Sequence, residues 1–128
     1  MPRAITGATD VAVYSQAMEG DLTRQIELTR QQIDQRMGMG DLLSTPRPTD
    51  HSAEFKKRES AVAAAEELGV LGYEVSLGKR GLMKVLLEAS KVSSVDLATA
   101  EAFTREVFDV VAKHGGDYDG WGGPVEEG

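Results

Sequence analysis

The chain has 128 residues, no cysteine and a net charge of −7. This length fits one domain with a modest core, and without cysteine neither a disulfide framework nor thiolate chemistry is available. Because nucleic-acid-binding domains gather positive charge, the acidic balance predicts no direct binding of nucleic acid. No apolar run long enough to span a bilayer and no N-terminal signal pattern is present, so we expect a cytoplasmic protein without a membrane partner.

The N-terminal third predicts one long helical segment. Residues 1–9 are expected to be a disordered lead-in, followed by a helical segment over residues 10–37 that Asp10 caps and that Gly20 is a candidate to divide. One narrow stripe recurs along it at spacings of three and four: Leu22, Ile26, Thr29, Ile33 and Met37. Glycines and two prolines then predict a linker over residues 38–50.

Residues 51–128 predict a compact domain in which strands and helices follow the order strand, helix, strand, strand, helix, strand. The strands are expected at residues 51–55, 73–77, 82–89 and 117–125, and the helices at residues 59–71 and from Ser93 or Ser94 to near His114. Gly78-Lys79-Arg80-Gly81 is the expected hairpin turn. This order predicts an α+β, ferredoxin-like βαββαβ fold: a four-stranded antiparallel sheet with two helices on one face, plus the added N-terminal helix.

The chemistry-bearing candidates gather in the glycine-rich segment 115–124. Asp117 and Asp119 lie two residues apart on a strand and therefore on one face, which suits metal binding or acid–base catalysis. The segment lacks the further oxygen ligands of a calcium loop, and surface carboxylates are common. We therefore expect no catalytic residue, no metal site and no cofactor, and the two histidines, His51 and His114, are expected in structural or surface roles.

Two interpretations of Tyr118 and Trp121 are open, one as partner-binding residues and one as packing residues. They could anchor a partner, as Tyr and Trp often do at interfaces, or pack on the long helix that contains Phe103. In a regular strand they face opposite sides, so one is expected in the core and the other exposed; a bulge at Gly120 would realign them. Asp117, Tyr118, Asp119 and Trp121 form the predicted partner-binding segment.

A local basic spot is also visible. The hairpin turn at residues 78–81 is followed by Lys84, and the run Lys56-Lys57-Arg58 lies upstream. The turn is too short for a phosphate loop and a strand follows it rather than a helix. This local basic spot is a weak signal for RNA binding.

Several of these motifs resemble a known family. Leu71-Gly72-Tyr73-Glu74-Val75 and Tyr118-Asp119-Gly120-Trp121-Gly122 resemble the two clearest signatures of the regulator of ribonuclease E activity B family, small bacterial inhibitors of ribonuclease E. Asp50-His51 with Phe55 resembles the family's first strand, and the Thr-Arg-Gln-Gln-Ile run lies where the family has its leading helix. The resemblance implies a ferredoxin-like fold and a non-enzymatic protein that binds ribonuclease E, or its scaffold region, and lowers RNA cleavage.

The alternative hypothesis is a small-ligand-binding or oligomerising regulatory domain. Ferredoxin-like sheets often pair or bind metabolites between subunits, an argument from fold alone. A homo-oligomer would form through a sheet edge or the N-terminal helix. An enzyme built on Asp117 and Asp119 ranks third.

Overall fold

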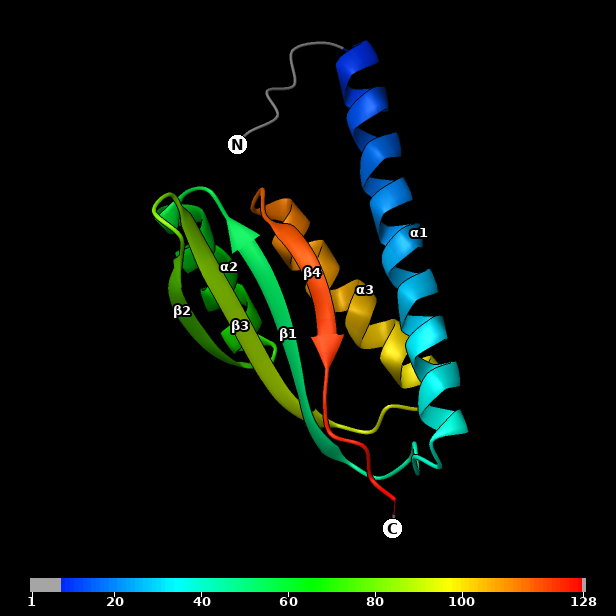
Figure 1. Ribbon diagram of the computed structural model, residues 1–128. Helices are drawn as coiled ribbons and strands as arrows, with labels where there is room; N and C mark the ends of the chain where they lie inside the picture. The colour runs from blue at the N-terminus through cyan, green and yellow to red at the C-terminus, as the bar shows by residue number, and fades with distance from the viewer. Residues whose placement is uncertain (1–7, 128) are drawn as a thin grey trace.

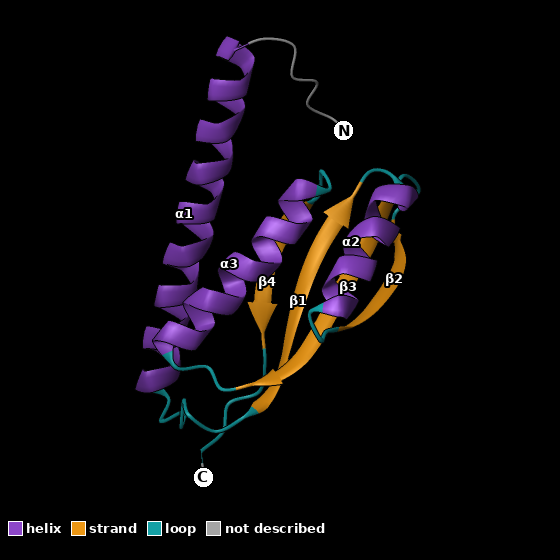
Figure 2. Ribbon diagram, turned by 180° about the vertical axis from the view of Figure 1, so that it is seen from behind, coloured by secondary structure: helices purple, strands orange, loops and turns teal. Residues whose placement is uncertain are grey.

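The computed structural model describes the backbone of residues 8–127 and the side chains of residues 21–127. The elements follow in the order α1 (Ala8–Gly38), β1 (Arg47–Phe55), α2 (Arg58–Val70), β2 (Glu74–Arg80), β3 (Lys84–Ser93), α3 (Leu97–Lys113) and β4 (Asp117–Gly122). The strands form one antiparallel sheet in the order β2-β3-β1-β4. Helices α2 and α3 cover one face of this sheet, and α1 runs along its β4 side (Figure 1; Figure 2). The predicted βαββαβ fold with an added helix is confirmed.

The core lies between the sheet and helices α2 and α3. Alternate residues of β1 are buried, as the two-residue repeat of a strand requires, and they face the apolar stripe of α3. Asp96 caps α3 by accepting a hydrogen bond from the Thr99 backbone N–H at 3.2 Å. The predicted cap at Ser93 or Ser94 was wrong, because β3 continues through Ser93, which pairs with Arg47.

Strand β1 begins four residues before its predicted start. Arg47 and Pro48 already pair with β3, so the predicted linker ends earlier than residue 50. Pro48 is tolerated there because β4 pairs with β1 only from Asp50 onward, which leaves β1 a single neighbour at the proline.

The β2–β3 hairpin turns later than predicted. Gly78 lies inside β2 opposite Leu86, and the turn is formed by residues 81–83. Gly81 has a φ of +68°, a backbone conformation that favours glycine. The sheet pairing therefore extends to Arg80 and Lys84, which face each other at the tip.

Helix α1 is continuous, so Gly20 does not divide it. It already includes residues 8 and 9, and the rest of the predicted lead-in lies outside the described residues. Within the stripe read from the sequence, Ile26 and Ile33 are buried, whereas Met37 is 61% exposed and Arg36 takes the buried position at this end of the helix. Within the described part of the chain, no helix combines the length and the apolar character needed to cross a bilayer.

Candidate partner-binding groove

A bulge in β4 sets the direction of its side chains. Ser52 pairs with Gly120 while the next residue of β1, Ala53, pairs with Tyr118, so β4 holds one extra residue at this point. Gly120 has a φ of +130°, which other residues rarely adopt. The bulge at Gly120 is therefore present, and it turns Tyr118 and Trp121 toward the same, helical side of the sheet.

Tyr118 lies inside the protein. Its side chain is 7% exposed, and its hydroxyl is 2.8 Å from Nδ1 of His51, which is 1% exposed. Burial raises the pKa of Tyr118 and lowers the pKa of His51 to about 4. Both groups are consequently neutral near pH 7, and Tyr118 offers almost no surface for direct contact.

Trp121 joins three elements and is partly exposed. Its indole Nε1 donates to Thr29 Oγ1 on α1 at 3.0 Å. Its ring meets the Phe103 ring of α3 edge-on, with centroids 4.8 Å apart, and the Arg36 guanidinium lies 5.2 Å from its centroid. A division into one core aromatic and one exposed aromatic was expected only for a regular strand. The bulge at Gly120, the exception named with that expectation, lets both aromatics pack on the helical side.

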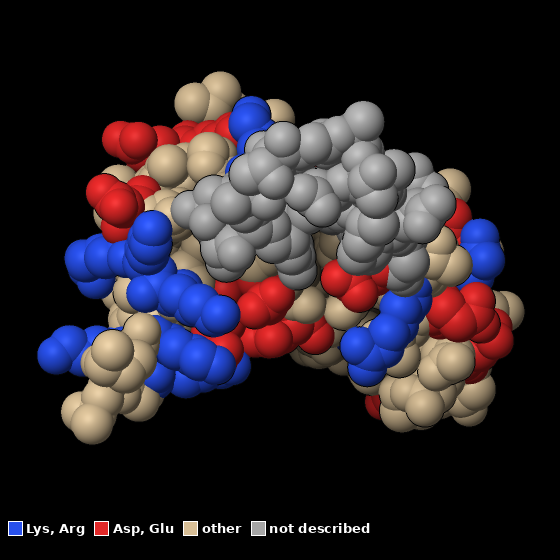
Figure 3. All heavy atoms as spheres, turned by 90° about the horizontal axis from the view of Figure 1, so that it is seen from above, with Lys and Arg blue, Asp and Glu red and all other residues tan. Residues whose placement is uncertain are grey.

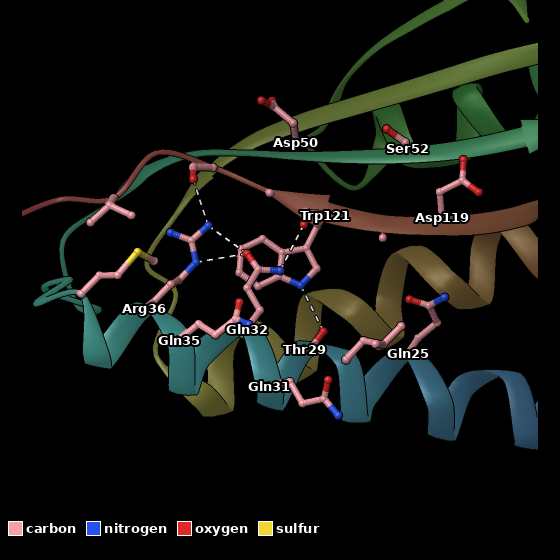
Figure 4. Close-up of a pocket in the computed structure, with 16 residues that line it drawn as sticks. Gln25, Thr29, Gln31, Gln32, Gln35, Arg36, Asp50, Ser52, Asp119 and Trp121 are labelled. Atoms are coloured by element: carbon pink, nitrogen blue, oxygen red, sulfur yellow. Dashed lines mark hydrogen bonds between the residues drawn. The ribbon is translucent and has the colours of Figure 1, made fainter.

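Helix α1 also donates hydrogen bonds to backbone carbonyls on the outer edge of β4. Gln25 Nε2 donates to the Tyr118 carbonyl at 3.2 Å. Gln32 Nε2 donates to the Trp121 carbonyl, also at 3.2 Å (Figure 4). Edge strands carry unpaired backbone groups that invite association with other chains. These glutamines, seven residues apart, therefore act as hydrogen-bonding partners in place of a fifth strand.

A surface groove of about 1000 Å³ runs between α1 and β4. Thr29, Gln32 and Trp121 lie in its middle (Figure 4). The lining includes Leu28, Gln31 and Gln35 from α1, Met39 directly after this helix, and Asp50, Ser52 and Asp119 from the sheet. Leu28 is 41% and Met39 is 54% exposed. Apolar and amide side chains thus line the helix side of the groove, and carboxylates line its sheet side.

The predicted segment divides between this groove and a neighbouring hollow. Asp119 and Trp121 line the groove, and Asp119 also accepts a hydrogen bond from Arg80 Nη1 at 3.1 Å. Asp117 lines a hollow of about 280 Å³ between α1 and the start of β4 instead. Within residues 21–127, no group of three or more His, Asp or Glu side chains is arranged to hold a metal ion.

Sequence reasoning missed the part that α1 plays in this site. The available signal was a second, polar stripe beside the apolar one, at spacings of four, three and four: Gln25, Thr29, Gln32 and Arg36. Such a stripe normally marks a solvated helix face. Here it is the face that docks on β4.

Beyond the groove, the uncovered face of the sheet is acidic. Asp50, Glu74 and Glu88 lie on this face and make no ion pair within residues 21–127. Glu54, near the hairpin end, pairs with Lys84 at 2.9 Å and with Arg80 at 3.1 Å. Hydrogen bonds from Lys84 and Arg80 lower the pKa of Glu54.

The fold and the groove define a class of protein: a small α+β domain in which a long helix closes one edge of the sheet. An open groove lies between this helix and the edge strand. The family model described as Regulator of ribonuclease activity B matches residues 21–123, from α1 to just past β4. The chain belongs to this family, which is one of regulators rather than catalysts. A comparison with curated proteins finds no match.

Proposed function

We propose that this protein is a non-enzymatic cytoplasmic regulator that binds ribonuclease E and lowers RNA cleavage. Family membership supports a role in regulating ribonuclease activity. The observation that carries the proposal is the α1–β4 groove, which exposed Leu28 and Met39 line on the helix side and Asp50 and Asp119 line on the sheet side. Such a groove suits a partner segment that combines apolar and basic side chains.

The four predicted residues take different parts in this proposal. Asp119 and Trp121 contact the partner segment, because both line the groove. Tyr118 fixes the strand from inside through His51. Asp117 contacts the partner only where the segment extends past the groove toward the start of β4.

The test measures binding of the purified chain to ribonuclease E and to its scaffold region, together with cleavage of a test RNA. Leu28→Glu places a charge on the apolar wall and is expected to weaken binding at least tenfold, about 1.4 kcal/mol. Leu97→Glu is the matched control, because Leu97 is 44% exposed but does not line the groove. Unchanged binding by Leu28→Glu would exclude the groove, and no binding of the unaltered chain to either target would exclude ribonuclease E.

One observation favours the alternative of an oligomerising domain. Strand β2 forms the other edge of the sheet and has no strand beyond it, and such edges can pair with a second copy. Light scattering over a range of protein concentrations distinguishes the two. A stable dimer that Ser76→Pro abolishes, without any binding to ribonuclease E, would favour the alternative.

A further inference from the structure

The tip of the β2–β3 hairpin carries two solvent-exposed apolar side chains. Leu82 is 100% exposed and Met83 is 82% exposed. They lie at the end of a protruding turn, with Lys79 and Arg80 before them and Lys84 after them (Figure 1). Single exposed apolar residues are ordinary on protein surfaces, but an adjacent pair without any packing partner, framed by cations, is not explained by the fold.

More cations gather at the same end of the sheet. The strand register places Phe55, Val85 and Lys79 in one row, and Lys56, Lys57 and Arg58 follow Phe55 directly. Seen from above, Lys and Arg side chains crowd the side of the molecule on which the hairpin lies (Figure 3). Six of the 14 Lys and Arg residues of an otherwise acidic chain are thus near this tip.

Most of these cations are free to bind an external anion. Arg80 and Lys84 pair with Glu54, and Arg80 also with Asp119. Within the described residues, no ion pair engages the remaining four, which are Lys56, Lys57, Arg58 and Lys79.

We propose that this hairpin end binds an anionic lipid surface, with Leu82 and Met83 entering the headgroup–acyl boundary and the free cations contacting lipid phosphates. Apolar side chains framed by Lys and Arg are the features of interfacial anchors. RNA fits less well, because single-strand binding relies on aromatic side chains that stack on bases, and the tip has none. An acidic protein fits less well, because it would leave the apolar pair without a hydrophobic partner.

The acidic net charge does not prevent this contact. The unpaired carboxylates of the uncovered face lie farther along the strands, Glu88 roughly 13 Å and Asp50 and Glu74 roughly 20 Å from the tip at about 3.3 Å per residue. Both separations exceed the screening length of about 8 Å at physiological salt. The α1–β4 groove lies along the β4 edge of the sheet, and its Asp119 pairs with Arg80 of the tip. The tip variants below leave Arg80 and Asp119 unchanged, so they test the inference separately from the proposed function.

The experiment is co-sedimentation of the full chain with vesicles of phosphatidylglycerol and phosphatidylcholine, and with pure phosphatidylcholine as reference. The unaltered chain is expected to bind the anionic vesicles, more weakly as salt rises. Leu82→Ser/Met83→Ser is expected to weaken binding at least tenfold. Lys56→Gln/Lys57→Gln/Arg58→Gln/Lys79→Gln is expected to weaken it by a similar or larger factor and to reduce the salt dependence.

Matched controls change the same chemistry elsewhere. Val70→Ser removes a side chain that is 88% exposed at the far end of α2, and Arg105→Gln removes an exposed cation on α3; neither is expected to alter binding. The proposal is overturned if the chain does not bind anionic vesicles, or if the tip variants bind them as the unaltered chain does. Binding of RNA or polyglutamate in place of vesicles also overturns it.

Discussion

At the scale of single residues, His51 is an imidazole that the fold keeps neutral. Its ring meets Tyr73 and Phe103 edge-on, with centroids 5.7 and 5.2 Å away, and Nδ1 bonds the Tyr118 hydroxyl. Burial lowers its pKa from 6.5 to about 4, against the smaller opposing effect of Asp50. As pH falls below 6.5, the unfolded chain therefore takes up a proton that the folded chain refuses.

This predicts a loss of stability in mild acid. The contribution of neutral His51 is fully present above pH 6.5 and declines as pH falls toward 4, by up to about 3 kcal/mol. Urea unfolding between pH 7 and 4.5 should show this decline in the unaltered chain but not in His51→Gln. His114→Gln, a change at a more exposed histidine, should retain it. The same slope in all three proteins would contradict the assignment.

Gly116 is required by a close approach rather than by its backbone angle. A Cβ at this position would lie 2.5 Å from the Phe55 ring, which is 1% exposed and cannot move aside. Gly116→Ala is therefore expected to lower the free energy of unfolding by about 1–3 kcal/mol. Gly122→Ala is the control, because a Cβ there meets nothing within 4 Å. Urea midpoints compare the two, and equal effects would show that the core can relax around the methyl group.

At the scale of elements, docking of α1 on β4 depends on Gln25 and Gln32. Replacing both with alanine leaves the Tyr118 and Trp121 carbonyls without these donors. We expect faster backbone hydrogen exchange in α1 and β4, with β2 unchanged, and a loss of about 1–3 kcal/mol. Gln31→Ala/Gln35→Ala is the control, since those exposed side chains make no hydrogen bond within residues 21–127. Equal exchange in both double variants would mean that packing alone holds α1.

A buried ion cluster ties the end of α1 to β1 and to the chain after β4. Asp41 contacts Arg47 Nη1 at 2.6 Å and Arg36 Nη1 at 3.0 Å, with its side chain 0% exposed. It also accepts from the Glu126 backbone N–H. Burial acts to raise the pKa of Asp41, but the hydrogen bonds from Arg47 and Arg36 outweigh it, so the pKa lies below 3.8. The cluster therefore keeps its stabilisation above pH 3.8 and loses it only as pH falls further.

Neutralising Asp41 should be one of the most damaging single changes in this chain. Asp41→Asn leaves two buried guanidinium groups without their counter-ion, for which we expect a loss of about 3–5 kcal/mol in urea unfolding. Glu54→Gln breaks the exposed pairs with Arg80 and Lys84 and should cost less than about 1 kcal/mol. A loss below 1 kcal/mol for Asp41→Asn would show that water or a neighbouring group replaces the carboxylate.

The docking of α1 on β4 and the ion cluster around Asp41 show where prediction from the sequence ended. The alternation of β1 and the stripe of α3 report burial within one element, so the fold could be predicted from them. The bonds from Gln25 to Tyr118 and from Arg36 to Gly123 join residues 93 and 87 positions apart. No local pattern marks such polar pairs. Likewise, Pro48 hid the start of β1, because pairing with β3 outweighs the usual preference of proline.

At the scale of the whole molecule, charge is divided between two ends of one sheet. Asp50, Glu74 and Glu88 leave the uncovered face acidic beside the α1–β4 groove, while the hairpin tip is basic. A carboxylate-lined surface steers a basic partner segment during encounter, and such steering weakens as salt screens it. Under the proposed function, the acidic face therefore controls how fast the ribonuclease binds more than how long it stays.

The triple variant Asp50→Asn/Glu74→Gln/Glu88→Gln tests this division. Stopped-flow or surface-based kinetics at low salt should show association with ribonuclease E slowed about tenfold, with dissociation changed much less. The control, Asp34→Asn/Glu66→Gln/Asp109→Asn, removes the same net charge from exposed helical positions. If both variants slow association equally, net charge rather than the acidic face governs encounter. If dissociation alone changes, these carboxylates contact the bound partner directly instead of steering it.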